Sequence, residues 1–518
     1  MKSYAELALS EYNSGTLTTR RCGSNGKPFW NTYSSQFMFV PQLMFTKIPG
    51  VKRYEYKATD SAGNTYSFEA DNHEAPLTPI WSKLAVGFVT VRVTAHHAST
   101  GESYAAGERT FYKTAPFPGR EALPPRARSY REAAGLAFRY VFESPVVRYL
   151  AEHGVPDPEY YHNVYPSKTL SSLVRAMISY AELEPTKKDE ALRIATSAAQ
   201  YLLSITYGEE SKLAGLPPTY SFLGLNKEIV DANAPAAYGR RNTVMMIYPS
   251  FVGNAYLDLE RATGDERYFQ AASRIAEYYL ENVLPSGSWY LLVDAMTGEP
   301  LHQNCCLHFR ILNFLNRYAA RTGDVRYREL EKNYFAYIRQ NCLEKYNWEG
   351  QFEDVPVTVN YQNLTHLTAD SMISYIAENM ADDAEMMAEA EELMRFVEDQ
   401  FVVWGEHAPW NPSMEKGAYW YSPAALEQYG WYVPIDASTI TVMRTFLNLY
   451  AVNKNPLLLE KACALADSIT RMQDPESGVI PTHWMSADCT KTLHNFWFNC
   501  HIGTAFGLMD IARVMGEE

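Results

Sequence analysis

A helical pattern that repeats from Ser129 onward constrains the fold of this chain more than any other feature of the sequence. An apolar helix ends in a short turn, and a helix with one charged face follows. The turns Thr263-Gly264-Asp265 and Thr322-Gly323-Asp324 lie roughly 60 residues apart, a period typical of repeated helical hairpins. In both turns, Gly is suited to end one helix and Asp to cap the next.

Twelve helices are predicted, and their two classes alternate. Their ranges are 129–151, 164–183, 187–206, 243–262, 265–283, 303–322, 324–343, 361–380, 383–401, 437–452, 456–472 and 495–514. A helix that is apolar on all sides is buried, so the classes predict an inner and an outer ring. Long aromatic connections precede the inner helices and short turns follow them, which favours a closed barrel with one functional mouth. An open solenoid of helix pairs is the alternative.

The first part of the chain has a different period. Alternating runs at 37–40, 53–58, 65–70, 87–95 and 109–113 are separated by turn signals and predict a small antiparallel β-sandwich. The fold class is therefore mainly α, an (α/α)6 barrel preceded by a β-sandwich domain. The predicted boundaries are an N-terminal extension over 1–28, the β domain over 29–119 and the barrel over 120–518.

Composition and charge exclude several kinds of partner. The net charge of −14, without a basic cluster, argues against nucleic acid. No apolar run is long enough for a membrane span, and no secretory signal is visible, which predicts a cytoplasmic location unless a signal has been removed. The seven cysteines are scattered without zinc-ligand spacing, so we expect free thiols, no metal and no cofactor. The oligomeric state stays open.

The aromatic stretch 419–438 carries the strongest chemical signal. It places Glu427 and Asp436 among six aromatic residues immediately before a predicted inner helix. Glu353 and Asp354 precede another inner helix. Because the inner helices start at the mouth, we expect these four acids to gather there, and we predict that two of them are catalytic. Rings that stack on sugar faces beside acids that transfer protons are what a carbohydrate-cleaving site requires.

The same loops supply candidate substrate-binding residues, since each long connection carries polar and aromatic side chains just before an inner helix. These candidates are Arg240, Arg241, Tyr248, Trp289, Asp294, Tyr361, His366, Trp410, Tyr429, His483, Trp484 and Trp497. Arg240 and Arg241 could hold a substrate carboxylate.

Other roles remain open for some candidates. Asp436 could cap the helix after it. Arg240 and Arg241 could be solvated loop charges, and His162, His366 and His483 could be hydrogen-bonded structural residues.

Five motifs resemble glycoside hydrolase family 154, within the wider group of α/α-barrel sugar hydrolases that includes the unsaturated uronyl hydrolases. They are PLTPIW at 76–81, GxRxFYKxxPFxG at 107–119, GSWYLLVDAMTGEP at 287–300, GQFEDV at 350–355 and LEQYGWYVPIDAS at 426–438. The resemblance implies a β domain joined to a helical barrel and removal of terminal β-glucuronic acid from a glycan.

A polysaccharide lyase with Tyr361, Tyr429 or His366 as its base, a sugar epimerase, and a non-catalytic glycan-binding protein remain alternatives.

Overall fold

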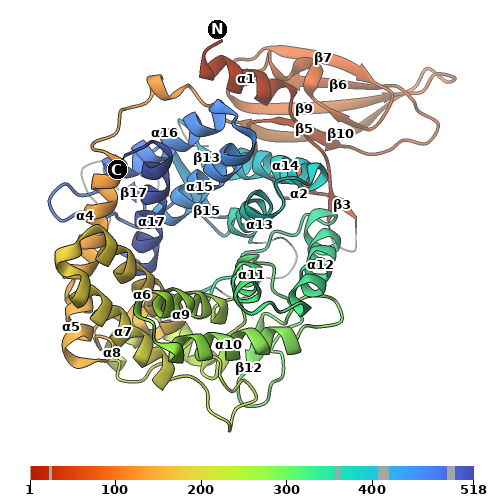
Figure 1. The fold of residues 1–518 in the computed structure, drawn as a ribbon. Coiled ribbons are helices and arrows are strands. Elements are labelled where there is room, and N and C mark those ends of the chain that lie inside the picture. Colours follow the sequence, from red (N-terminus) through yellow and green to blue (C-terminus); the bar gives the residue numbers. More distant parts are fainter. Residues whose placement is uncertain are drawn as a thin grey trace.

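The computed structural model describes residues 2–22, 26–355, 357, 361, 363–405, 419–486 and 496–517. Figure 1 shows a ring of paired helices with a β domain at one side. Within the described residues, six helices form the inner ring: α6 (Pro166–Leu183), α9 (Pro249–Thr263), α11 (Arg310–Thr322), α13 (His366–Asn379), α15 (Asp436–Asn453) and α17 (Phe498–Val514).

The outer ring packs against them. It consists of α4 (Tyr130–Glu143) with α5 (Pro145–His153), α7 (Lys188–Ser204), α10 (Glu266–Glu281), α12 (Arg326–Ile338), α14 (Ala384–Phe401) and α16 (Pro456–Met472). The pairs follow the chain, with α6 on α7, α9 on α10 and α15 on α16, and α17 closes the ring against α4 and α6. The predicted barrel is therefore confirmed.

The outer and inner helices differ as the pattern predicted. In α10, Tyr268, Ala272, Ile275 and Tyr279 are buried along one stripe, and the opposite face is charged. Inner helices instead approach one another closely through glycine. A Cβ added to Gly253 of α9 would clash with the Phe314 ring of α11, and one on Gly507 of α17 would clash with Ile440 of α15. Larger side chains at these two positions would push neighbouring inner helices apart.

The connections from outer to inner helices all carry additional structure. These elements are η2 (Tyr161–Val164), α8 (Lys227–Asn233), η4 (Pro235–Arg240), β11 (Thr243–Met245), β12 (Leu292–Asp294), η5 (Arg339–Leu343), β13 (Val402–Val403), β14 (Tyr419–Trp420), β15 (Ala424–Gln428), β16 (Trp431–Pro434) and β17 (Met485–Ser486). Turns in the other direction are short, as between α9 and α10 or α15 and α16. The elongated connections therefore gather at one end of the barrel.

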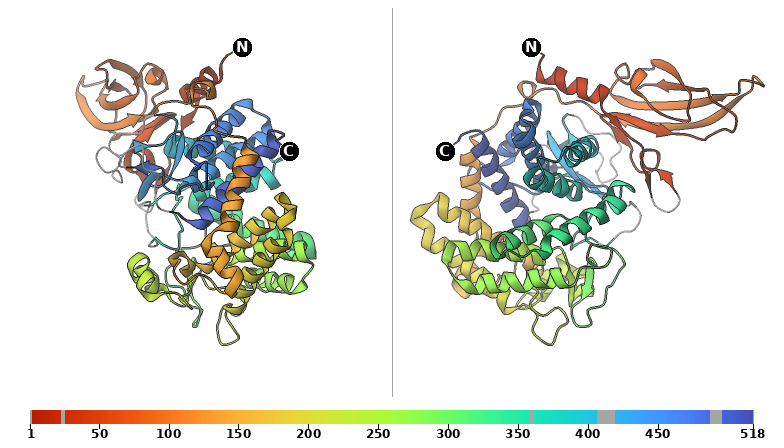
Figure 2. Two further views of the ribbon diagram at one scale, coloured as in Figure 1. Left: turned by 90° about the vertical axis from the view of Figure 1, so that its left-hand side faces the viewer. Right: turned by 45° about the vertical axis from the view of Figure 1, so that its right-hand side comes forward.

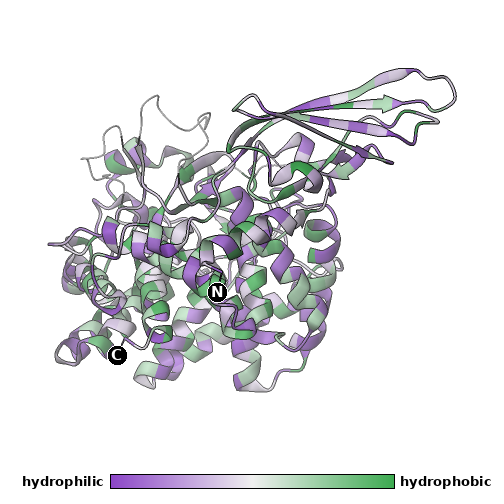
Figure 3. Cartoon of the chain, turned by 90° about the horizontal axis from the view of Figure 1, so that it is seen from above, coloured by the Kyte–Doolittle hydropathy of each residue, from purple (hydrophilic) through white to green (hydrophobic). Residues whose placement is uncertain are grey.

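The N-terminal domain contains two main sheets. Its elements are α1 (Tyr4–Ser14), β1 (Thr16–Leu17), β2 (Arg21–Cys22), β3 (Lys27–Pro28), α2 (Phe29–Thr32), β4 (Gln36–Phe37), β5 (Val40–Met44), β6 (Tyr54–Thr59), β7 (Thr65–Ala70), β8 (Glu74–Pro76), α3 (Thr78–Trp81), β9 (Gly87–His96) and β10 (Ser103–Lys113). The sheets run β4-β10-β9-β6-β7 and β1-β5-β8. Most pairs are antiparallel as predicted, but β4–β10 and β1–β5 are parallel. Seen from above, the longer sheet projects away from the helices (Figure 3).

Part of the predicted N-terminal extension over 1–28 packs with this domain and with the barrel. Strand β1 pairs with β5, and α1 contacts α16 of the barrel. Figure 2 shows the same placement of the β domain from two further sides. Within the described residues, no helix combines the length and apolar character that crossing a bilayer would require.

Buried polar residues at the end of α14 join the two parts. The Asp399 carboxylate accepts hydrogen bonds from the backbone amides of Met38 at 2.5 Å and Phe39 at 2.7 Å. Glu398 accepts a hydrogen bond from the Tyr12 hydroxyl and pairs with the Lys461 ammonium at 2.8 Å. Lys461 is only 1% exposed, so this ion pair is shielded from water.

Replacing Lys461 with Met is expected to destabilise the protein by about 3–5 kcal/mol, because it leaves the Glu398 carboxylate buried without its cation. Chemical denaturation measures the loss. Lys227→Met provides the matched control, since Lys227 pairs with Asp231 at the surface, where water screens the pair, and its replacement should leave stability nearly unchanged. Equal effects of the two substitutions would contradict the role given to the buried pair.

Candidate active site

Two cavities meet at the loop end of the barrel. The barrel cavity, of about 550 Å³, lies between the inner helices. The mouth cavity, of about 570 Å³, lies among the connecting loops. Both are lined by Lys168, Phe352, Glu427, Ile435 and Cys500. A ligand that crosses from the loops into the barrel therefore passes Glu427.

Glu427 lies on β15 and is half-buried. Burial, and next the negative charge of Asp354, raise the pKa of its carboxyl to about 8. The Glu427 backbone is held by the Thr365 hydroxyl, which donates to its carbonyl oxygen at 3.0 Å. At neutral pH this side chain is mostly protonated and can donate a proton to a group in either cavity.

Asp354 opens onto the mouth cavity and is exposed there. Desolvation by the surrounding walls, and next the charge of Glu353, raise its pKa to about 6, while Lys168 acts in the opposite direction. Asp354 is therefore mostly ionised at neutral pH, whereas Glu427 is mostly protonated. Two carboxyl groups whose surroundings separate their pKa values can divide the roles of acid and base.

Glu353 has a different environment, although it is adjacent in sequence. It is 1% exposed and lies behind the described walls of both cavities. One carboxylate oxygen pairs with the Lys168 ammonium at 2.5 Å, and the other accepts a hydrogen bond from the Tyr248 hydroxyl. With both oxygens occupied, Glu353 is suited to hold Lys168 and Tyr248 in place.

Arg240 binds the backbone of the same loop. Its guanidinium donates to the carbonyl oxygens of Glu353 and, at 3.0 Å, Val355. The Tyr220 hydroxyl also donates to the Glu353 carbonyl at 2.8 Å. The structure thus shows Arg240 holding the backbone of this loop, and its contact with a substrate carboxylate stays a prediction. Arg241 is exposed and stacks over Phe222, with 5.1 Å between its guanidinium carbon and the ring centroid.

Asp436 is the first residue of α15 and is fully buried behind the described cavity walls. Its carboxyl accepts hydrogen bonds from the Thr504 hydroxyl of α17 at 3.0 Å and the Ala437 amide at 2.6 Å. Burial raises its pKa well above the usual range. The predicted gathering of four acids thus resolves into two that face a cavity, Glu427 and Asp354, and two that lie behind it.

Aromatic side chains line the mouth cavity. Among the predicted residues, His483 and Trp497 lie here, and Tyr248 lines the barrel cavity. Trp431 is 39% exposed, with its ring 6.0 Å from that of His483. Trp497 stacks on His162 at 3.7 Å between centroids. Planar, partly exposed rings of this kind can stack on a sugar.

Several other predicted contacts lie away from the cavities. The Trp289 indole is buried and donates to the Tyr279 carbonyl at 2.9 Å, and that of Trp484 donates to the Pro481 carbonyl at 3.0 Å. Asp294 closes a turn by accepting from the Thr297 amide at 2.9 Å. In these three cases, local hydrogen bonding or packing determines the side-chain position.

Three candidate bases are also engaged elsewhere. The Tyr361 hydroxyl donates to the Lys345 carbonyl at 2.8 Å, and that of Tyr429 donates to Gln400. His366 is fully buried against Asp370. Trp410 lies outside the described residues.

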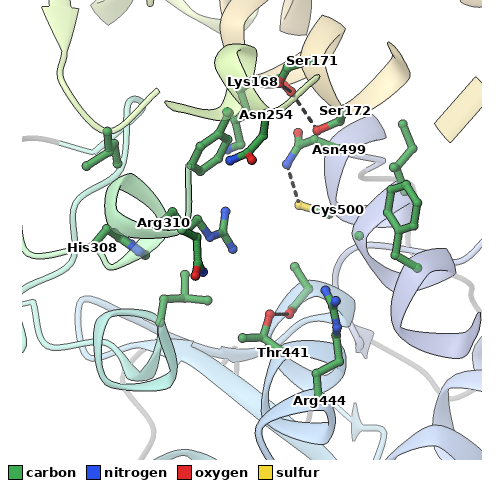
Figure 4. Close-up of a pocket in the computed structure, with 18 of the residues that line it drawn as sticks. Lys168, Ser171, Ser172, Asn254, His308, Arg310, Thr441, Arg444, Asn499 and Cys500 are labelled. Atoms are coloured by element: carbon green, nitrogen blue, oxygen red, sulfur yellow. Dashed lines mark hydrogen bonds between the residues drawn. The ribbon is translucent and has the colours of Figure 1, made fainter. Parts of the chain in front are cut away.

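The structure adds cavity residues that the sequence pattern did not indicate. Lys168, His308, Arg310, Asn499 and Cys500 come from the first turns of inner helices or the residues just before them (Figure 4). Their position at the start of an inner helix was the available signal, since such positions face the mouth.

The described residues contain no cluster of three or more His, Cys, Asp or Glu side chains arranged to bind a metal ion.

Comparison with known proteins gives no family model and no curated protein that matches the chain. Similar solved structures include a family 76 glycoside hydrolase from a bovine Bacteroides thetaiotaomicron strain. Its alignment covers 92% of this chain and 99% of that chain, with 10% sequence identity and a TM-score of 0.46. An unsaturated glucuronyl hydrolase specific for heparin covers 75% of this chain and 97% of its own, with 10% identity and a TM-score of 0.46.

Cellobiose 2-epimerase from Spirochaeta thermophila covers 70% of this chain and 89% of its own, with 14% identity and a TM-score of 0.46. Likeness this distant carries no argument about activity. By themselves, the fold and the site define a class of protein: a barrel of helical hairpins with two carboxyl groups near the junction of two cavities.

Proposed function

We propose that this protein is a glycoside hydrolase that removes terminal uronic acid, as in a β-glucuronide, from a glycan. Glu427 donates the proton to the leaving-group oxygen, and Asp354 activates the water that attacks the sugar. The observation that supports this most directly is a carboxyl group with a pKa of about 8 at the junction of the cavities, near a second with a pKa of about 6.

The surroundings of the two acids support the same division of work. Glu427 reaches both cavities, so it can protonate the oxygen that links a sugar on one side to a leaving group on the other. Asp354 opens onto solvent in the mouth cavity, where water is available. Lys168 and Tyr248 fix Glu353, and Arg240 fixes the backbone beside it, so Asp354 is carried on a well-held loop.

A screen with aryl glycosides and uronic-acid oligosaccharides tests the proposal, with reducing sugar and ultraviolet absorbance followed together. Hydrolysis releases reducing sugar without a new double bond, whereas a lyase raises absorbance. The lyase alternative has less support, because Tyr361, Tyr429 and His366 are each engaged away from the cavities. Absence of turnover on every glycoside would overturn the proposal, and isomerised sugar as product would indicate an epimerase.

The dependence of kcat/KM on pH should be bell-shaped, with its maximum near pH 7. The rate should rise through about pH 6 as Asp354 loses its proton and fall through about pH 8 as Glu427 loses its own. Because the two groups interact, the limbs report the pair. A rate that continues to rise above pH 9 would contradict the acid role of Glu427.

A further inference from the structure

Five cationic side chains line the barrel cavity, although the protein as a whole is acidic. They are Lys168, Arg175, Arg310, Arg317 and Arg444. Four of them have a carboxylate partner. Lys168 pairs with Glu353 at 2.5 Å, Arg175 and Arg317 share Asp258 at 2.8 and 2.6 Å, and Arg444 pairs with Asp510 at 2.7 Å.

Arg310 differs from the other four. Among the described residues, no carboxylate lies within ion-pair distance of its guanidinium, and its side chain is exposed to the cavity. Figure 4 shows it extending from the start of α11 into the space between the helices. The guanidinium packs over the Phe251 ring, 4.8 Å from its centroid. Desolvation by the walls of the cavity lowers the pKa of Arg310 to about 10, so it stays charged at neutral pH.

His308 lies two residues earlier and lines the same cavity. It is 5% exposed, and its Nδ1 is buried without a hydrogen-bond partner among the described residues. Burial lowers its pKa to about 3, so the ring is neutral and its nitrogens can donate or accept one hydrogen bond each. A cation without a carboxylate partner and a ring nitrogen without a hydrogen-bond partner, both from residues that line one cavity, leave capacity for a polar ligand group.

The segment that carries both residues is tied to the loop of the acids. The Leu307 amide donates to the Gln351 side chain at 2.9 Å, and the Phe309 amide donates to the Ser371 hydroxyl at 3.2 Å. Gln351 in turn lies two residues before Glu353. These bonds hold the 307–310 segment in a defined position relative to the 351–354 loop.

We propose that Arg310, assisted by His308, binds the carboxylate of the substrate's uronic acid inside the barrel cavity. This inference rests on the proposed function and specifies how the substrate is oriented. The uronic acid lies on the barrel side of Glu427, and the leaving group extends into the mouth cavity. The planar guanidinium can bind both carboxylate oxygens at once. Neutral donors and acceptors for sugar hydroxyls line the same cavity, namely Ser171, Ser172, Asn254, Asn313 and Asn499.

The test compares an aryl β-glucuronide with the matched aryl β-glucoside, which differs only in having CH2OH in place of the carboxylate. Arg310→Gln should lower the ratio of kcat/KM for glucuronide over glucoside by about 10- to 100-fold. Arg310→Lys should recover part of that preference. Arg193→Gln, on the exposed face of α7, should leave the ratio unchanged. An unchanged ratio in Arg310→Gln, or equal losses on both substrates, would overturn the assignment.

Calorimetric binding of free glucuronate, glucose and glucose 6-sulfate separates this inference from the proposed function. The wild type should bind glucuronate more tightly than the other two, and Arg310→Gln should lose that difference even if no glycoside is turned over. Preference for the sulfate ester, or glucuronate binding that Arg310→Gln leaves intact, would overturn the inference while the hydrolase proposal stands. Glucuronate binding without turnover of any glycoside would leave the Arg310 site in place and end the hydrolase proposal.

Discussion

Replacing Glu427 with glutamine is expected to lower kcat by about 10²- to 10⁴-fold on a glycoside with a poor leaving group, because general acid catalysis contributes an effect of that size. Glutamine keeps the shape of the side chain but has no proton to give. On an aryl glycoside with an acidic phenol as leaving group, the loss should be much smaller, since that phenolate departs without protonation. Steady-state kinetics over a series of phenols measures the difference.

The same substitution should remove the fall in rate above pH 8, because the group that titrates there is gone. Glu182→Gln is the matched control, because Glu182 is exposed near the far end of α6. Its replacement should leave the rates over the series of phenol leaving groups and the pH profile unchanged. If Glu427→Gln loses the same factor on every leaving group, Glu427 is not the general acid.

Replacing Asp354 with asparagine is expected to lower hydrolysis by about 10²- to 10⁴-fold, because the water is no longer activated by a carboxylate. The loss should be similar for all leaving groups, which distinguishes this variant from Glu427→Gln. The rise in rate near pH 6 should also disappear. Azide or formate, which need no activation, should restore part of the turnover through the open mouth cavity.

Asp382→Asn supplies the control for charge removal, since Asp382 is exposed in the turn before α14.

The configuration of an azide adduct from Asp354→Asn would show whether the reaction inverts or retains the configuration of the sugar. Inversion and retention require different separations of the two carboxyl groups. Full activity of Asp354→Asn would transfer the base role to another residue and would contradict the pairing proposed here.

The sequence predicted the framework of the fold well because helical hairpins are local structures. Their apolar spacing, Gly-Asp turns and long connections lie within short segments, so the twelve helices and their alternation could be inferred from the chain alone. Two predicted segments changed at their boundaries beside a proline: 129–151 is divided into α4 and α5 at Ser144-Pro145, and 243–262 begins later, at Pro249. Proline at the start of each later helix explains both shifts.

The candidate site was predicted less completely. Glu427, Asp354, His483 and Trp497 line the mouth cavity and Tyr248 lines the barrel cavity, because these residues flank the starts of inner helices; their roles stay predictions. The sequence could not distinguish the buried Trp289 and Trp484 from cavity-lining aromatic residues, because a buried and an exposed tryptophan have similar sequence neighbours. The sequence did not indicate Arg310, because a single arginine just before an inner helix has no local pattern that distinguishes it from a solvated charge.

The sequence by itself determined the ring of hairpins, the end at which its loops gather and the shortlist of acids, because periodicity and turn chemistry depend on neighbours along the chain. Only the tertiary structure decided which acids face the cavities and which cation has no partner. Lys168 and Tyr248 occupy Glu353, Thr504 binds Asp436, and Asp258 and Asp510 neutralise the other arginines. Those partners lie far apart in sequence, and folding alone brings them together.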